Sequence, residues 1–409
     1  MPYSRARETA CVKRPQRRTP AQHENMRTRL QTTQALKRTL GALAVGAGVA
    51  AQAAPPVITN IAMVPRLSIV SDVGAADQIA YCTNLGQSNW VVLTNLMVTQ
   101  SPYWFVDAAA PPSPPRFYRV TLNQANYAVP GGMALIPAGS FTMGDTLDGD
   151  SSALPLHTNY VSAFYMDTNL VSLAQWQQVY QWATNSGYTF DYRGAGKAAN
   201  HPVQNIDWYD CVKWCNARSE REGRIPAYYT DPGLTERYRT GQAGPYVNWS
   251  TGYRLPTEAE WEKAARGGAS GHRFPWSNVD TISWGQANYY ADPPVYAYDV
   301  NPTGGSNPTF NDGVLPYTSP VGYFAANGYG LYDMAGNLSQ WCWDWYGLYS
   351  SASQSDPRGA ASGSSRVQRG GCWGLYALYG RAAARDSSYP TYRDSYLGFR
   401  SVLPPPGQP

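Results

Sequence analysis

The pattern of hydrophobic and polar positions changes along the chain, and its first regular part is a series of short alternating segments. Apolar and polar residues alternate over residues 67–71, 78–82, 90–93 and 116–120. Alternation over four to eight residues, with turn residues between the segments, is typical of half-buried β-strands. We therefore predict a small β-sandwich-like module over residues 55–125. It contains no catalytic constellation, so we expect it to act as a spacer or an adhesion unit.

Three later segments have the periodicity and the polar first residue of amphipathic helices. They run from Ser172 to about Ala183, from Asp207 to Gly223, and from Thr257 to Gly267. Glu260 follows Thr257 at the spacing of a capping box. We expect Glu258, Glu260 and Glu262 to serve in capping and surface ion pairing rather than in acid–base catalysis.

The segment from Tyr329 to Arg400 has neither pattern. It is rich in aromatic residues and glycine and contains few aliphatic runs. The whole chain of 409 residues has 38 Gly and 32 Pro, about one residue in six, which favours turns over long helices. The length also exceeds that of one ordinary core, so we expect two domains.

Residues 1–53 have the features of a leader with a signal peptide. Basic residues precede a small apolar run, Leu40 to Ala51, and Ala51-Gln-Ala53 has the form of a cleavage site. The apolar run is shorter than the roughly 20 residues of a membrane span. We predict an exported protein without a membrane span, either secreted or at the periplasm or cell surface. A disordered basic tail is the alternative.

The basic residues of the leader dominate the net charge of +4. Ten of the 32 Lys and Arg, but two of the 28 Asp and Glu, lie in residues 1–53, which leaves 22 basic and 26 acidic residues. The rest of the chain is therefore near −4, and we predict no nucleic-acid partner.

Cysteine and histidine give little support for a soft-metal site. Five cysteines follow the leader, an odd number that leaves at least one thiol unpaired. Cys211 and Cys215 are four residues apart on a predicted helix, where we expect them to pack as small hydrophobic side chains. The four histidines are scattered, so no histidine-built metal site is expected.

Five motifs, in order, suggest a family. They are Met133-Ala-Leu-Ile-Pro-Ala-Gly-Ser-Phe-Thr-Met-Gly144, Tyr253-Arg-Leu-Pro-Thr-Glu-Ala-Glu-Trp-Glu-Lys-Ala-Ala-Arg-Gly-Gly268, Tyr329-Gly-Leu-Tyr-Asp-Met-Ala-Gly-Asn337, Arg369-Gly-Gly-Cys-Trp373 and Leu397-Gly-Phe-Arg400. Over residues 133–402 the chain resembles the formylglycine-generating enzyme, or sulfatase-modifying factor, family. The resemblance implies an α+β, loop-rich domain of C-type-lectin-like fold. We place it at residues 127–405, after the all-β module.

The resemblance also implies structural Ca²⁺, an ion that suits irregular loops because it accepts six to eight oxygen ligands with loose geometry. At a first site, Asn288 and Asp312 would give side-chain oxygens, and Tyr289 and Val314 would give carbonyl oxygens. A second site would lie at Asn337 and Gln340. The family typically has Glu in the place of Gln340, and a neutral amide should weaken any Ca²⁺ there.

The oxidase chemistry of the family uses two cysteines five residues apart, which suit copper(I). Counted from Gly371, their positions fall on Leu375 and Gly380. Cys372 occupies the place of a family serine, and it is the candidate catalytic thiol if an oxidase remains. Cys342 is a candidate disulfide partner or second ligand for it. We do not expect copper, and the His-rich helical domain of the related nonheme-iron branch is not found in this sequence.

The segment from Trp373 to Tyr396 is the candidate ligand-binding surface. Its large aromatic residues lie among Gly, Ser, Asp and Ala, a composition typical of antibody-type binding loops. They are Trp373, Tyr376, Tyr379, Tyr389, Tyr392 and Tyr396. With Arg381, Arg385 and the final motif, the segment also resembles the variable region of retroelement-diversified proteins of lectin-like fold. The alternative is that these rings pack a core.

These observations favour a non-catalytic module that binds an exported protein or a glycan on a calcium-stabilised scaffold. The first alternative is a formylglycine-generating-type oxidase, which would oxidise a cysteine of a protein substrate. The second is an assembly or maturation factor for exported partners. The sequence makes no prediction of the oligomeric state.

Overall fold

The computed structural model describes residues 65–69, 76–84, 90–97, 103–107, 109–110, 115–122, 129–276 and 278–405. The predicted leader, residues 1–53, lies outside the described residues. None of the described helices is long and apolar enough to cross a membrane.

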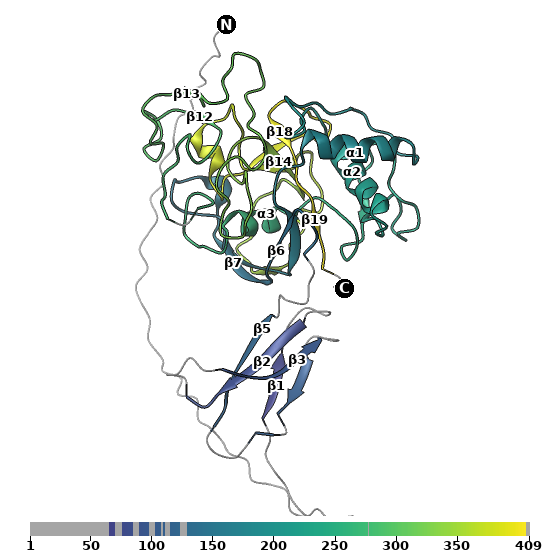
Figure 1. The fold of residues 1–409 in the computed structure, drawn as a ribbon, viewed down its shortest axis with the longest axis vertical. Coiled ribbons are helices and arrows are strands. Elements are labelled where there is room, and N and C mark those ends of the chain that lie inside the picture. Colours follow the sequence, from purple (N-terminus) through teal and green to yellow (C-terminus); the bar gives the residue numbers. More distant parts are fainter. Residues whose placement is uncertain are drawn as a thin grey trace, which may run out of the picture. The chain divides into compact units, whose positions relative to one another are not determined.

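The first group of strands lies within the predicted β module (Figure 1). Its strands are β1 (Arg66–Ile69), β2 (Ala76–Cys82), β3 (Val91–Met97), β4 (Tyr103–Val106) and β5 (Phe117–Leu122). They pair antiparallel in two sheets, β1-β4 and β3-β2-β5. Asp107 accepts hydrogen bonds from Arg116 Nη1 (2.6 Å) and Tyr118 Oη (2.9 Å), which ties the end of β4 to β5. Strand β4 was missed at the sequence level.

The second group of elements forms a loop-rich domain of three helices and many short strands. Its strands are β6 (Met133–Ile136), β7 (Gly139–Met143), β8 (His157–Val161), β9 (Phe164–Asp167), β10 (Tyr228–Tyr229), β11 (Tyr246–Val247), β12 (Tyr290–Ala291), β13 (Gly305–Ser306), β14 (Ser339–Trp345), β15 (Gln354–Ser355), β16 (Arg366–Arg369), β17 (Asp386–Ser388), β18 (Leu397–Gly398) and β19 (Val402–Leu403). The larger sheets have the strand orders β17-β16-β14-β18, β15-β8-β7 and β19-β9-β6. Two short 3₁₀ helices, η2 (Ser151–Ala153) and η3 (Ala377–Gly380), lie in the loops. The predicted α+β, loop-rich class is confirmed.

The three predicted helices are confirmed as α1 (Leu173–Thr184), α2 (Trp208–Arg221) and α3 (Glu258–Ala265). Each begins after a polar cap whose side chain accepts a backbone hydrogen bond: Ser172, Asp207 and Thr257. In α3 the Glu260 side chain also accepts from the Thr257 nitrogen, which completes the predicted capping box.

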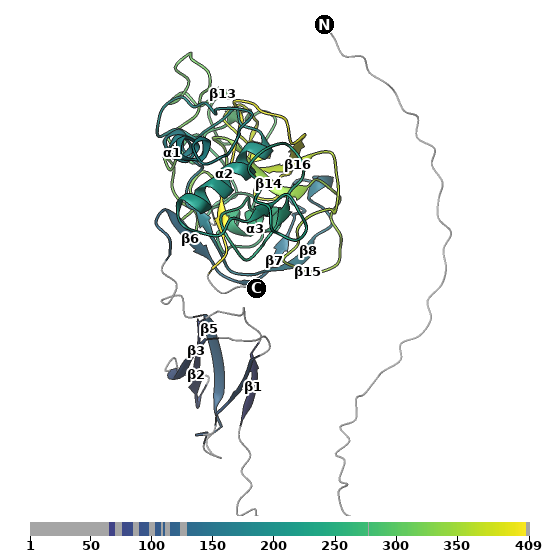
Figure 2. The ribbon, with the colours of Figure 1, turned by 90° about the vertical axis from the view of Figure 1, so that its right-hand side faces the viewer.

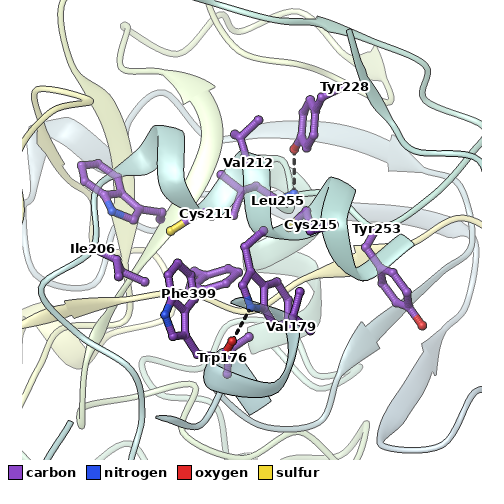
Figure 3. Packing of buried hydrophobic residues seen from close by; sticks show 14 of the residues in the cluster. Trp176, Val179, Ile206, Cys211, Val212, Cys215, Tyr228, Tyr253, Leu255 and Phe399 are labelled. Atoms are coloured by element: carbon purple, nitrogen blue, oxygen red, sulfur yellow. Dashed lines mark hydrogen bonds between the residues drawn. The ribbon is translucent and has the colours of Figure 1, made fainter. Parts of the chain in front are cut away.

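The main core joins α1 and α2, which lie side by side (Figure 2), to the last strands of the chain. Trp176 of α1 stacks on Trp214 of α2, with ring centroids 6.0 Å apart, and Phe399 meets both rings edge-on. Cys211 and Cys215 are buried in this core as free thiols, as predicted (Figure 3). The core therefore holds the C-terminal segment against the helices.

The glutamates of α3 contradict one expectation. Glu258, Glu260 and Glu262 are all buried, so the prediction that they form ion pairs at the surface is wrong. Each instead forms a buried ion pair, because strands and loops surround this short helix (Figure 1). The partners are Arg385 for Glu258 (2.6 Å), Arg254 for Glu260 (2.6 Å), and Arg266 (2.7 Å) with Arg369 for Glu262. Such pairs leave no carboxylate of α3 free for acid–base work.

Candidate binding site around the segment 372–396

The candidate thiol, Cys372, lies just after β16, where the chain turns through two glycines. Gly370 and Gly371 have φ of 93° and 67°, a left-handed conformation that favours glycine. The turn directs Cys372 inward, where it is 1% exposed. Burial raises the pKa of this thiol to about 12. A buried neutral thiol is a poor nucleophile and a poor copper ligand, which is evidence against the predicted catalytic role.

The candidate second thiol, Cys342, lies on β14 and is also buried and free. The disulfide between Cys342 and Cys372, which the sequence left open, is therefore not formed. All cysteines in the described part of the chain are free and buried, and none other than Cys372 lies between positions 372 and 400. The segment thus has one inaccessible thiol where the related oxidase chemistry needs an accessible pair.

Trp373 was predicted as a ligand-binding residue, and this prediction is wrong because the side chain is 4% exposed. The ring packs against Leu170 and Leu338, and Nε1 donates to the Ser395 carbonyl oxygen (3.1 Å). Tyr396 packs on the same ring, with centroids 4.6 Å apart and the ring planes tilted by 32°. Trp373 therefore anchors the loop that carries the later tyrosines.

The tyrosines of the segment separate into two groups. Tyr376 follows the buried Trp373 and is exposed, whereas Tyr389, Tyr392 and Tyr396 are exposed on the loop after β17. Tyr392 Oη donates to an Asp394 carboxylate oxygen (2.7 Å), which orients that ring. The two groups are connected by the Trp373 anchor, because Tyr396 packs on it from the second group.

Tyr376 extends a row of aromatic rings contributed by other loops. Its ring lies 5.6 Å from that of Tyr290 and 5.9 Å from that of Tyr296, which stacks on Tyr298 at 5.7 Å. The guanidinium of Arg273 lies over Tyr298, 4.6 Å from the ring centroid. Half-exposed aromatic rings of this kind offer apolar area with little loss of side-chain entropy on binding.

Next to this row lies a large cavity of about 890 Å³. Tyr379, half-buried at the end of η3, lines it together with Tyr296 and Tyr298. Its polar wall contains an ion-pair network in which the buried Arg381 contacts Asp148 (3.1 Å) and Asp150 (2.8 Å). Rings beside fixed charges give the cavity the mixed character of a specific ligand site.

Most of this cavity could not be predicted from the sequence. Its walls come from residues 148–152, 273–281, 295–298 and 378–385, which are distant in sequence. Asp148, Asp150 and Arg273 belong to no local motif. From the sequence alone, each resembles an ordinary charged residue of a loop. The available signal was the tyrosine segment itself, which contributes Tyr379, Arg381 and Arg385 to the cavity.

At the first predicted calcium site, Asn288 has a feature that favours a cation. Its side chain is buried, and Nδ2 donates to the Tyr317 carbonyl oxygen (2.7 Å). Its Oδ1 has no hydrogen-bond partner among the described groups, and a buried acceptor of this kind calls for a donor or a cation. The carbonyl oxygen of Tyr289 accepts a long hydrogen bond from Trp284 Nε1 (3.3 Å).

The other two predicted ligands of this site already converge on a positive charge. Lys197 Nζ lies 2.7 Å from Asp312 Oδ1 and 3.1 Å from the Val314 carbonyl oxygen. Contact with Lys197 lowers the pKa of the Asp312 carboxyl group. The donor set is hard oxygen and fits Ca²⁺, which would have to displace the ammonium group of Lys197.

The second predicted calcium site fits poorly. Gln340 Oε1 accepts from Trp261 Nε1 (2.8 Å) and Arg400 Nε (2.7 Å), and Nε2 donates to the Asp333 carbonyl oxygen (2.8 Å). Asn337 Oδ1 accepts from the Ser319 nitrogen (3.1 Å). The amide oxygen of Gln340 therefore has no lone pair left for a metal, and a guanidinium lies against it.

Comparison with known proteins agrees with the architecture. The profile of the "Sulfatase-modifying factor enzyme 1-like domain" matches residues 120–404. The formylglycine-generating enzyme of Thermomonospora curvata is 33% identical over 306 residues, covering 67% of this chain and 94% of that protein. The same enzyme of Bos taurus is 32% identical over 300 residues, covering 67% and 76%. The solved structure of Treponema denticola variable protein 1 superposes with a TM-score of 0.51 at 28% identity, covering 67% and 95%.

Proposed function

The chain belongs to the family of sulfatase-modifying factor enzyme 1-like domains, and from this premise we propose that it is an exported, non-catalytic member that binds a protein or glycan ligand. One contrast within residues 372–396 carries the proposal. The single thiol of this segment is buried and held neutral, whereas four of its tyrosines are exposed.

The ligand contacts we propose are Tyr376, Tyr389, Tyr392 and Tyr396, with Tyr379 at the wall of the large cavity. Tyrosine suits this role because each ring offers apolar area and a hydroxyl group while losing few rotamers. The ion-pair network of Arg381 fixes the cavity wall before the ligand arrives. Binding to such a preformed surface avoids part of the ordering cost.

We propose Ca²⁺ as a structural ion at the first site, where Asn288, Tyr289, Asp312 and Val314 would hold it. Its charge would satisfy the orphaned Asn288 oxygen and join the two loops that carry these residues. The loop of Asn288 and Tyr289 reaches the aromatic row through the next residue, Tyr290, which packs on Tyr376.

The binding test uses the purified chain without its leader on a glycan array and against a panel of exported-protein peptides. For any ligand found, a triple variant with Tyr376, Tyr389 and Tyr392 each changed to Ser should lose at least about tenfold in affinity, since exposed aromatic anchors dominate interfaces. The matched control changes Tyr246 and Tyr323 to Ser, because both are similarly exposed but lie outside this segment. Equal loss in both variants would contradict the proposed surface.

The oxidase alternative is tested on the same preparation by metal analysis and by oxygen consumption with a sulfatase-type peptide, Cys-Thr-Pro-Ser-Arg. We expect no stoichiometric copper or iron and no peptide-dependent oxygen uptake. Oxygen uptake that disappears in the Cys372→Ser variant would establish the oxidase instead.

A further inference from the structure

A second, smaller cavity of about 230 Å³ lies beside α3. Residues from β8, β14, the first turn of α3 and the loop after β14 line it. None of the predicted ligand or metal residues lines this cavity, and Arg385 is the one residue that it shares with the large cavity.

The floor of the small cavity is one face of β8. His157, Asn159 and Val161 point to this face and are buried, a place where a strand ordinarily carries apolar side chains. Asn159 is 1% exposed, and its Nδ2 donates to Met143 Sδ (3.2 Å). A thioether can only accept, so the amide nitrogen faces the sulfur and Oδ1 points the other way. This Oδ1 is buried and has no hydrogen-bond partner among the described residues.

His157 adds a second acceptor. Its Nδ1 lies 2.9 Å from the Pro155 carbonyl oxygen. Because a carbonyl oxygen cannot donate, Nδ1 must carry the proton, which leaves Nε2 of the neutral ring as an acceptor. In the described part of the protein, Nε2 has no hydrogen-bond partner.

Asp344 of β14 adds a carboxylate. One of its oxygens accepts a hydrogen bond from the Glu258 nitrogen (2.7 Å) at the start of α3. No described Lys or Arg nitrogen lies within salt-bridge distance of it, although the neighbouring glutamates are all paired. Burial, together with the nearby Glu258, raises the pKa of Asp344 well above its usual range. Asp344 is thus a buried acid without a cationic partner.

Two of the donors that line the cavity, Arg385 and Tyr349, are already used. Arg385 donates to Glu258 through Nε (2.6 Å) and Nη2 (2.8 Å), and through Nη1 to the carbonyl oxygens of Ser152 (3.2 Å) and Gly347 (3.0 Å). Tyr349 Oη also donates to Glu258 (3.2 Å). The cavity therefore offers unpaired acceptors and a buried acid, and its one cationic side chain, Arg385, is already paired with Glu258.

We propose that the small cavity binds an organic cation, an alkylammonium or guanidinium group, whose N–H donors pair with Asn159 Oδ1, His157 Nε2 and the Asp344 carboxylate. Such a cation supplies several donors, and its positive charge would favour the ionised form of Asp344. At about 30 Å³ per water molecule, the cavity holds the equivalent of several waters, enough for a cationic head group and a short alkyl chain.

The test is calorimetric titration of the full chain with methylguanidinium and n-propylammonium, with 1-propanol as the neutral control. We expect saturable 1:1 binding of at least one cation and none of the alcohol. Asp344→Asn keeps an oxygen acceptor for the Glu258 nitrogen but removes the charge, and Asn159→Val removes the orphaned oxygen. Each variant should weaken binding by about tenfold or more. Asp280→Asn, which removes a carboxylate from the large cavity, should leave the affinity unchanged.

Two further arms identify the source of the cation. Agmatine represents a free amine, and the N-acetyl methylamides of arginine and lysine represent a side chain of a peptide. Tighter binding of the amides would assign the cavity to a basic side chain of a partner, and tighter binding of agmatine to a small molecule. The proposal is overturned if neither simple cation binds, or if binding is unchanged in Asp344→Asn and Asn159→Val while near-ultraviolet circular dichroism shows that both variants are folded.

Discussion

Arg385 and Glu258 form a two-point ion pair, with Nε 2.6 Å from Oε1 and Nη2 2.8 Å from Oε2. The pair joins the segment after η3 to the first turn of α3, although the two residues are 127 positions apart. Both side chains are buried, and the guanidinium also lies over the ring of Tyr349, 3.9 Å from its centroid. One contact therefore links the candidate binding segment, the capped helix and the wall of both cavities.

We predict that Arg385→Gln lowers the free energy of unfolding by about 3–5 kcal/mol, because the buried Glu258 carboxylate loses its two-point partner and keeps only the longer ion-pair contact with Arg369 Nε (3.6 Å). Urea denaturation at pH 7 measures the change. The double variant Arg385→Gln/Glu258→Gln should recover part of the loss, since the uncompensated charge is removed. As a control, Arg237→Gln breaks an exposed ion pair with Glu220 and should have little effect. Equal losses for Arg237 and Arg385 would contradict the buried-pair argument.

The helix caps and the ion pairs of α3 show how far the sequence predicts this fold. The Thr257–Glu260 capping box depends on residues three apart, and so it was predicted correctly. Arg385, which pairs with Glu258, and Arg369, which pairs with Glu262 alongside the local Arg266, are more than 100 residues away in sequence. Nothing local therefore shows that other segments cover the helix. Local motifs therefore predicted the helix and its cap correctly, but they predicted a solvent-exposed environment for glutamates that are buried.

Prediction of the candidate binding site from the sequence has the same limit, as the segment 372–396 shows. Trp373 and Tyr389 are both large aromatic residues of the same segment, but one is 4% and the other 66% exposed. The difference arises because Leu170 and Leu338, from other parts of the chain, cover Trp373. The cavities were not predicted for the same reason, because their walls combine loops that meet only in three dimensions.

The buried thiols give a second prediction. In the folded protein Ellman's reagent should react very slowly with all the cysteines after residue 53, because each is buried and free. Labelling should be complete in guanidinium chloride. Rapid reaction of one thiol in the native protein, lost in Cys372→Ser, would show that this site opens to solvent and would revive the oxidase alternative.

The contact of Lys197 with Asp312 and Val314 gives a third prediction, for Ca²⁺. We expect millimolar Ca²⁺ to raise the melting temperature, since an ion that binds the folded state stabilises it. Lys197→Met should tighten Ca²⁺ binding by about tenfold, because Ca²⁺ no longer has to displace an ammonium group from its ligands. Arg237→Met is the charge-matched control elsewhere on the surface. A melting temperature independent of Ca²⁺ in both the original chain and Lys197→Met would contradict the proposed site.

The last prediction concerns pH and Asp207, the cap of α2. Asp207, Asp191 and Asp210 bring carboxylate oxygens within 4.8 Å of one another. Lys213 Nζ contacts the other two at 2.8 and 3.0 Å, whereas Asp207 has no ion pair among the described residues. Burial, and then the charge of Asp210, raise the pKa of Asp207 from 3.8 to about 7.

Between pH 4 and 7 the unfolded chain has therefore lost this proton while the folded protein still holds it. The sign follows directly: the free energy of unfolding falls as pH rises through this window, and the group adds no further change above about pH 7. Asp207→Asn keeps the cap, because its amide oxygen can still accept the hydrogen bond from the Asp210 nitrogen, which is 2.8 Å in the original chain. The difference in free energy of unfolding between this variant and the original chain should therefore be small at pH 4 and grow to roughly 2–4 kcal/mol, in favour of the variant, by pH 8. Urea denaturation across this range, with a chelator present, measures the gain, and parallel pH profiles for the two proteins would show that Asp207 is already ionised in the fold.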